Sequence, residues 1–469
     1  MNSGGLVSHV DPIAPVILGV TTILAFAIVG RIGARKLGQP TVLGELVMGI
    51  LLGNIAWYLG FDLITVLREG ARVFEIVNLA LAGQPVADVA ASIFGPAKGE
   101  EIVRIVTGPH GGEVMQVAHA VDVFSRYGII FLLFMVGLDT SLDEFRKVGN
   151  DAMRVAAIGV IVPVGLGYAA ATLLRNDLPF SSSLFVAATL AATSIGISAN
   201  VLLETGTSKS REGRIILGAA VVDDILGLIL LAVVSGIVVG GSVAFTDVGK
   251  VILISAVFLV ATVKLGPSIV RLSAHIMSRL DIVEAKMFTS YLFVMVLAWG
   301  ANLAGLATII GAFAAGVILT DRFFRDRDLE RRKSHKRFVS IRELIMPLEV
   351  ILVPIFFILM GIQVKLESFL SWPVLTFSVG LLIAAIFGKL ASGLGAGRGV
   401  NRLAVGLGML PRGEVGLVFA AIGRTLGVID DAVFSAIVLM VMLTTLIAPP
   451  LLEATLIRAK GDVGNPGQS

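Results

Sequence analysis

The chain has 469 residues, of which 56% are apolar and 15% are charged, and its formal net charge is +3. Soluble domains carry closer to a quarter charged residues, so this composition excludes a soluble enzyme and a nucleic-acid-binding module. The absence of cysteine excludes a disulfide scaffold, a thiolate metal site and a cysteine nucleophile.

Long apolar runs predict about 13 membrane-spanning helices, because about 20 apolar residues cross a hydrocarbon core roughly 30 Å thick. Residues 1–13 contain no Lys or Arg, so we interpret the first run as a retained helix rather than a cleaved signal peptide. The predicted spans are residues 14–30, 41–59, 119–138, 152–174, 183–203, 213–240, 249–270, 284–304, 306–320, 346–364, 372–394, 403–423 and 432–454.

Basic residues are concentrated in alternate connections between these spans. The short connections 175–182, 241–248 and 424–431 carry one basic residue or none each. The opposite set carries Arg31, Arg35, Lys36, Arg146, Lys147, Lys209, Arg211, Arg214, Arg398, Arg402, Arg458, Lys460 and the basic run 321–342. The positive-inside rule therefore places the N-terminus outside and the C-terminus in the cytoplasm, with 455–469 as a short cytoplasmic tail.

The first polar features lie in and after the span at 41–59. Glu45 is a carboxylate inside that span, where it either acts as an accessory charge partner or has a packing or helix-end role. The long connection 60–118 then lies outside and contains helical spacing at about 63–82 and 86–94. We interpret this insertion as a surface cap or a helical hairpin beside a dimer contact.

The span at 183–203 is expected to be interrupted. Residues 190–200 read LAATSIGISAN and place Thr, Ser, Gly and Asn in mid-membrane. Unwound backbone at that depth is tolerated only where it lines a cavity, and the half-helix ends then offer carbonyls and dipoles to ions.

Asp223 and Asp224 lie in the middle of the span at 213–240. Ionisable groups at this depth cost roughly 2.5–3.5 kcal/mol each and usually belong to an ion path or proton relay. Adjacent residues on a helix point about 100° apart, so one carboxylate can bind a cation while the other turns to a partner in the bundle. Two like charges in a poorly solvated site disfavour double ionisation, so a proton and a cation are expected to compete there.

The remaining polar features lie in the second half of the chain. The run 321–342 carries nine Lys or Arg and is typical of a helix at the membrane surface among anionic lipids. Lys389 lies deep in the span at 372–394, where it either pairs with an aspartate or snorkels to the cytoplasmic interface. Residues 406–416, GLGMLPRGEVG, predict a second interruption, in which Arg412 and Glu414 neutralise dipole ends and each other.

Two pairs of segments resemble each other in the same chain order. Residues 41–54, TVLGELVMGILLGN, match 308–321, TIIGAFAAGVILTD, so that Ala312 corresponds to Glu45. Residues 134–145, FMVGLDTSLDEF, match 358–369, ILMGIQVKLESF. Paired spans run in opposite directions on the orientation above, which predicts inverted repeats over about 41–240 and 306–454 within a transporter domain at 1–454.

Other chemistries have no support in the sequence. The five histidines fall in loops or at span ends, so a histidine proton relay is not indicated. No phosphate-cradling loop, hydrolase triad or metal-ligand cluster is present in the sequence, and we expect neither an enzyme nor a cofactor.

These motifs together resemble the monovalent cation:proton antiporter-2 family, which includes NapA-like Na⁺/H⁺ antiporters and glutathione-gated K⁺ efflux systems. The similarity covers roughly 14–454 and rests on these segments in order: GELVMGILLGN at 44–54, FMVGLDTSLDEF at 134–145, ATSIGI at 192–197, VVDDILGLI at 221–229, GAFAAGVIL at 311–319 and GMLPRGEVGL at 408–417.

The resemblance implies an all-α, thirteen-helix, NhaA/NapA-like inverted-repeat fold with two broken crossing helices, a homodimer, and elevator-like movement. It also implies that Asp224 is the main cation and proton carboxylate, that Asp223 pairs with Lys389, and that the backbone near Thr193 and Ser194 supplies ligands. The chain departs from the family pattern in its longer 60–118 insertion and in having only about fifteen residues after the last span.

The resulting hypothesis is a proton-coupled Na⁺ or Li⁺ antiporter of a prokaryotic plasma membrane. K⁺/H⁺ exchange on the same scaffold is the nearest alternative, and a cation-coupled solute symporter or a channel-like protein is a more distant one. The expected partners are monovalent cations, protons, membrane lipids and a second copy of the chain, with no nucleic acid.

Overall fold

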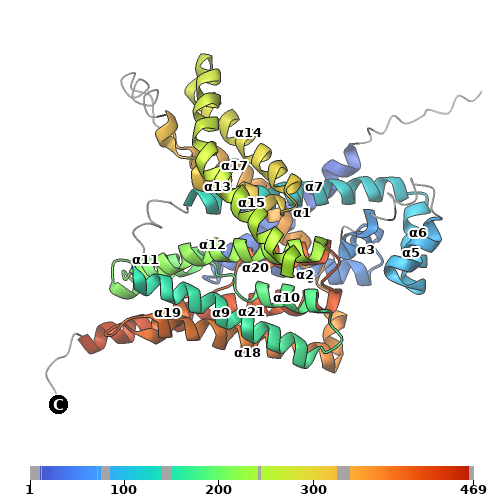
Figure 1. Cartoon of the computed structure of the whole chain (residues 1–469). Coiled ribbons are helices and arrows are strands. Elements are labelled where there is room, and N and C mark those ends of the chain that lie inside the picture. The colour runs from blue at the N-terminus through green and yellow to red at the C-terminus, as the bar shows by residue number, and fades with distance from the viewer. Residues whose placement is uncertain are drawn as a thin grey trace, which may run out of the picture. The chain divides into compact units, whose positions relative to one another are not determined.

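The computed structural model describes residues 11, 13–70, 72–74, 76, 85–139, 149–240, 245–324 and 339–463. Within these ranges the chain forms helices and turns and no β-strand (Figure 1). Nine of the described helices are long and apolar enough to cross a membrane, and three shorter apolar helices accompany them. The all-α membrane fold is confirmed, whereas the number of 13 spans stays a prediction.

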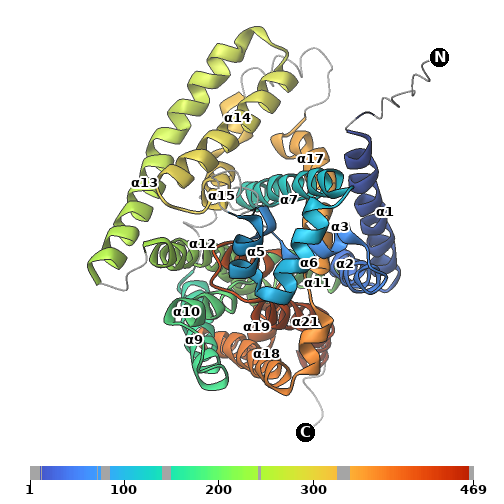
Figure 2. The same cartoon turned by 90° about the vertical axis from the view of Figure 1, so that its right-hand side faces the viewer.

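The chain divides into two compact units, the first of which comprises residues 1–127 and 351–364. Its elements are α1 (Ala14–Lys36), α2 (Thr41–Tyr58), α3 (Asp62–Glu69), α5 (Val86–Phe94), α6 (Pro96–Thr107), the first part of α7 (Gly111–Asp139) and the last part of α17 (Ile341–Ile362). Helices α1 and α2 form a hairpin, and α5 lies beside α6 (Figure 2).

The helices of the 60–118 insertion differ from those expected. The structure describes α3 and α5 near the predicted stretches, but part of 63–82 lies outside the described residues. Helix α6 and the early start of α7 were not predicted, because their sequences are too polar to stand out by hydropathy. Pro96 opens α6 at a position where its missing N–H is not needed by the helix.

The second unit comprises residues 128–350 and 365–469. Its helices are the rest of α7, α9 (Asn150–Leu174), α10 (Phe180–Thr189), α11 (Ile195–Glu204), α12 (Arg211–Gly240), α13 (Phe245–Ile276), α14 (Ile282–Leu303), α15 (Thr308–Ile318), the first part of α17, α18 (Trp372–Ser392), α19 (Arg402–Gly408), α20 (Glu414–Thr425) and α21 (Asp431–Val463). Short 3₁₀ turns η1 (Met277–Arg279), η2 (Asp321–Phe324), η3 (Leu366–Leu370) and η4 (Gly393–Gly395) connect some of them.

The predicted span at 306–320 is a shorter helix in the structure. Helix α14 ends at Leu303, and the chain then turns through Gly305, whose positive φ of 73° favours glycine. Helix α15 begins only at Thr308 and has 11 residues, which is too short to cross a bilayer by itself.

An apolar cluster holds the centre of the second unit together. It joins buried side chains from α9, α11, α12, α19 and α21, among them Val155, Leu202, Ile216, Val405 and Leu452. Helices α9 and α18 lie side by side in both views (Figures 1 and 2). The members of the cluster on α12 end at Val222, directly before the two aspartates.

Candidate ion-binding site at two interrupted helices

Two helices of the second unit are broken where the sequence predicts interruptions. Helix α10 ends at Thr189 and α11 begins at Ile195, while α19 ends at Gly408 and α20 begins at Glu414. Each gap leaves backbone carbonyls and N–H groups without the partners that a continuous helix would give them.

The two gaps satisfy part of this need by bonding to each other. The Ser194 N–H donates to the Pro411 carbonyl at 2.9 Å. The Thr193 hydroxyl donates to the Met409 carbonyl at 3.3 Å, and the Ser198 hydroxyl donates to the Gly408 carbonyl. The hydroxyl residues of 190–200 therefore hold the two unwound segments against each other.

Gly413 allows this close approach. A Cβ atom at Gly413 would lie 2.8 Å from the Ser194 Oγ atom and 2.9 Å from the Ser194 Cβ atom, both inside van der Waals contact. Any larger residue at 413 would push the two unwound segments apart.

Arg412 is fully buried and stabilises the end of α10. Its guanidinium donates to the carbonyls of Thr189 at 3.4 Å, Ala192 at 3.1 Å and Ala385 at 3.3 Å. Because the C-terminus of a helix carries partial negative charge, this cation has a favourable position there. The Arg412 carbonyl accepts a hydrogen bond from the Thr445 hydroxyl of α21, which fixes the backbone of the second gap.

Asp223 and Lys389 form an ion pair inside the second unit. The Lys389 ammonium donates to both Asp223 carboxylate oxygens, at 2.9 and 3.2 Å. The side chains are 1% and 0% exposed, so Lys389 does not snorkel to an interface. Burying either charge without the other would be very costly, which is why the pair occurs together.

Asp224 follows Asp223 on α12 and is also buried, with 6% exposure. Helical geometry turns its side chain about 100° away from that of Asp223. The structure thus provides two adjacent buried carboxylates on a helix that is long and apolar enough to cross a membrane, and Asp223 is paired with a lysine from α18.

Two glycines shape this site, and the sequence analysis did not single them out. A Cβ atom at Gly159 of α9 would lie 3.8 Å from both the Asp223 Oδ1 and the Lys389 Nζ atoms. A Cβ atom at Gly388 would lie 2.8 Å from the Cα atom of Pro163, so this glycine lets α18 approach α9. A glycine in an apolar run carries no signal of what packs against it.

Glu45 lies on α2 in the first unit, where it pairs with Arg31 of α1. Glu414 begins α20, but its side chain lies outside what the structure describes, so its predicted pairing with Arg412 stays a prediction.

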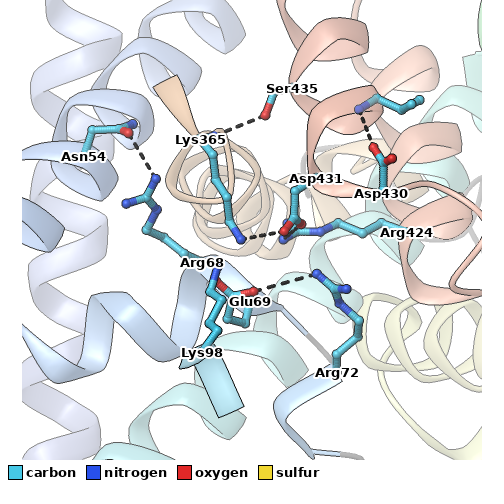
Figure 3. Close-up of polar contacts among 11 residues, drawn as sticks. Asn54, Arg68, Glu69, Arg72, Lys98, Lys365, Arg424, Asp430, Asp431 and Ser435 are labelled. Atoms are coloured by element: carbon cyan, nitrogen blue, oxygen red, sulfur yellow. Dashed lines mark hydrogen bonds and ion pairs between the residues drawn. The ribbon is translucent and has the colours of Figure 1, made fainter. Parts of the chain in front are cut away.

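Further polar clusters occur in each unit, and sequence patterns gave no sign of them (Figure 3). In the second unit, Asp431 accepts from the Lys365 ammonium at 2.5 Å and the Arg424 guanidinium at 2.7 Å. These contacts tie the end of α20 to the start of α21, so they help to hold the second broken helix.

In the first unit, buried Glu69 accepts from Lys98 at 2.6 Å and lies 3.7 Å from the Arg72 guanidinium (Figure 3). The Arg68 guanidinium donates to the Asn54 side chain at 3.3 Å and stacks over Trp57. These contacts join α3 to α2 and α6, so the insertion is anchored to the first unit by charged groups.

The fold and the site together define a polytopic membrane protein in which two broken helices meet beside buried, paired charges. That arrangement is typical of secondary transporters of ions. Among the described residues, no three histidine or acidic side chains gather as they would at a metal-cofactor site.

The chain matches the family described as "Sodium/hydrogen exchanger, transmembrane" over residues 91–458, and it belongs to this family. It is 35% identical to the high-affinity Na⁺/H⁺ antiporter NhaS3 of Synechocystis sp. over 459 residues, covering 96% of this chain and 91% of that protein. It is 31% identical to the Na⁺/H⁺-K⁺ antiporter GerN of Bacillus cereus, covering 81% of this chain and 95% of that protein.

A solved structure shows the same fold. The sodium proton antiporter MjNhaP1 from Methanocaldococcus jannaschii aligns with a TM-score of 0.63 at 16% identity, covering 95% of this chain and 99% of that chain. The predicted resemblance to cation:proton antiporters is thereby confirmed, and these relatives are transporters rather than enzymes.

Proposed function

We propose that this protein is a Na⁺(Li⁺)/H⁺ antiporter in which the cation and the proton compete for Asp224. The observation that carries the proposal is the buried Asp223–Lys389 pair next to Asp224, in the unit that also contains the two crossed gaps. The antiporters NhaS3 and GerN, to which the chain is similar, support the choice of Na⁺ and H⁺.

The roles of the site residues follow from their contacts. Lys389 holds Asp223 in place, and we assign uptake of the transported ion to Asp224, the neighbouring buried carboxylate of α12. Thr193 and Ser194 lie in the first gap and provide oxygen atoms near the place where the two gaps are hydrogen-bonded to each other. A carboxylate that binds a cation releases its proton, and this competition is sufficient for exchange if the empty carrier rarely changes orientation.

Glycine contacts support the inverted repeats at about 41–240 and 306–454. Gly49 of α2 packs against Gly361 of α17, and its repeat mate Gly316 of α15 packs against Gly137 of α7. Gly137 and Gly361 are themselves repeat mates, so the same helix contact occurs twice with the halves exchanged. We extend the proposal to elevator-type alternating access by a homodimer with its N-terminus outside and its C-terminus in the cytoplasm.

K⁺/H⁺ exchange is the second candidate. GerN is described as a Na⁺/H⁺-K⁺ antiporter, and this chain covers 95% of its length. The cation that fits best depends on the size of the site and on its ligand number, which transport measurements with Na⁺, Li⁺ and K⁺ compare directly.

The test uses purified protein in proteoliposomes with a pH-sensitive dye inside. Wild type is expected to release protons on addition of Na⁺ or Li⁺, and Asp224→Asn is expected to abolish this response because a neutral amide carries neither ion. Asp62→Asn, which removes an exposed carboxyl group of α3, is the matched control and keeps the response. Robust Na⁺-dependent exchange by Asp224→Asn would refute the assignment of Asp224.

A further inference from the structure

Glu45 of α2 is a buried carboxylate with one oxygen atom in use and one without a hydrogen bond. The Arg31 Nε and Nη2 atoms contact the same oxygen, Oε1, at 2.8 and 2.7 Å. The other oxygen, Oε2, is buried and has no hydrogen-bond partner among the described residues. The Glu45 side chain is 1% exposed, whereas that of Arg31 is 27% exposed.

Packing of the α1–α2 hairpin does not require this charge. The two helices approach through Gly30 and Gly44, where a Cβ atom at either glycine would lie within 2.4 Å of the other residue's carbonyl oxygen. In the matching pair, Gly311 of α15 packs equally closely against the Leu297 carbonyl of α14. Ala312, which is fully buried, stands there in the place of Glu45.

The chemistry around Oε2 selects its ligand. A metal cation needs several oxygen ligands, and the Arg31 guanidinium 2.7 Å from Oε1 would repel it. A proton needs only one oxygen atom, and its binding to Oε2 leaves Oε1 free to accept from Arg31. The geometry therefore favours a proton over a metal ion.

Within the first unit, α2 packs against α1, α3 and the last part of α17, which carry few charged groups. Arg35 and Lys36 follow Arg31 on α1 and are exposed. The only other ionisable residue of α2 is Tyr58 at its far end, and residues 351–362 of α17 contain none. Of the charges of α3, the Arg68 guanidinium lies 3.3 Å from the Asn54 side chain, and Asn54 is nine residues, about 14 Å, from Glu45 along α2.

We propose that Glu45 is a second proton-binding site, which takes a proton on Oε2 and tunes the pH dependence of exchange without binding the transported cation. The tuning part rests on the proposed antiporter function. On the proposed orientation, Glu45 lies just inside the cytoplasmic end of α2, where cytoplasmic protons reach it. Protonation removes the charge of Glu45 and weakens the link between α1 and α2, while partly exposed Arg31 stays solvated.

Proton binding is tested by infrared difference spectroscopy of the purified full-length protein, titrated between about pH 5 and about pH 9. A carboxylic acid band is expected to titrate in wild type and in Asp62→Asn, and to be missing in Glu45→Gln. Arg31→Gln is expected to shift the titration of this band to higher pH, because it removes the charge that favours the ionised form. Absence of a Glu45-dependent band, or no shift in Arg31→Gln, overturns the proton site.

Tuning is tested by the pH profile of cation-dependent exchange in proteoliposomes. Glu45→Gln imitates the protonated state, so its rate is expected to match wild type at the acidic end and to differ from it by twofold or more at the alkaline end. Glu45→Asp restores the wild-type profile. Identical profiles for Glu45→Gln and wild type overturn the tuning role. Loss of exchange in wild type itself would refute the proposed function instead, and the infrared result would stand apart from it.

Discussion

Replacing Lys389 by methionine tests whether Asp223 and Lys389 are stable inside the protein only as a pair. The substitution leaves Asp223 at 1% exposure without its ammonium partner. Removing one member of a buried pair costs about 3–5 kcal/mol, whereas removing both charges is close to neutral. With an unfolding entropy of about 2.1 cal/mol/K per residue, a chain of this length loses about 1 °C of melting temperature per kcal/mol. Lys389→Met is therefore expected to melt about 3–5 °C below wild type.

The double variant Asp223→Asn/Lys389→Met completes the measurement. It carries neither charge, so it is expected to recover most of the loss and to melt within about 2 °C of wild type, the remainder being the cost of a buried amide. The assay is thermal unfolding of the detergent-purified protein, with charge movement at two membrane potentials as the functional readout. A double variant as unstable as Lys389→Met would refute the reasoning, since the loss would then not come from an unpaired charge on Asp223.

Two other predictions concern the two broken helices and the connection between α9 and α10. Gly413→Ala brings a Cβ atom to 2.8 Å from the Ser194 Oγ atom, so we expect it to lower the free energy of unfolding by about 1–3 kcal/mol and to reduce exchange activity. Gly33→Ala is the control, because a Cβ atom there meets open space. Equal stability of the two variants would contradict this prediction. Asp177 accepts two hydrogen bonds from Arg175, and these lower the pKa of the Asp177 carboxyl group. The ion pair therefore stabilises the protein at pH values above the pKa of Asp177 in the unfolded chain, and this stabilisation is lost as the pH falls through the pKa in the folded protein. The melting temperature of Asp177→Asn is expected to be lower than that of wild type at neutral pH and equal to it well below about pH 4. Thermal unfolding at several pH values measures this, and a difference that persists in acid would argue against the ion pair.

The sequence predicted the breaks because polar residues and Pro411 are costly in an apolar span unless backbone is unwound there. It also left two alternatives for Lys389, and only the distance to Asp223 separates pairing from snorkelling. The close packing at Gly159 and Gly388 was not predicted, because it depends on which helix lies against each glycine. The anchoring of the insertion through Glu69 and Lys98 was missed for the same reason, since these residues meet from different helices.

The two halves of the chain are alike in their helix contacts and different in their charges. The glycines at 49 and 316 occupy matching positions and make matching contacts, so they follow from the shared fold. The charges do not repeat: Glu45 corresponds to Ala312, and the Asp223–Lys389 pair takes its acid from the first half and its base from the second. On the proposed inverted repeats, the scaffold supplies close packing without these charges, so each one is retained at a cost in stability. We therefore attribute these charges to the proposed function, the Asp223–Lys389 pair to the exchange of ions and Glu45 to its pH dependence.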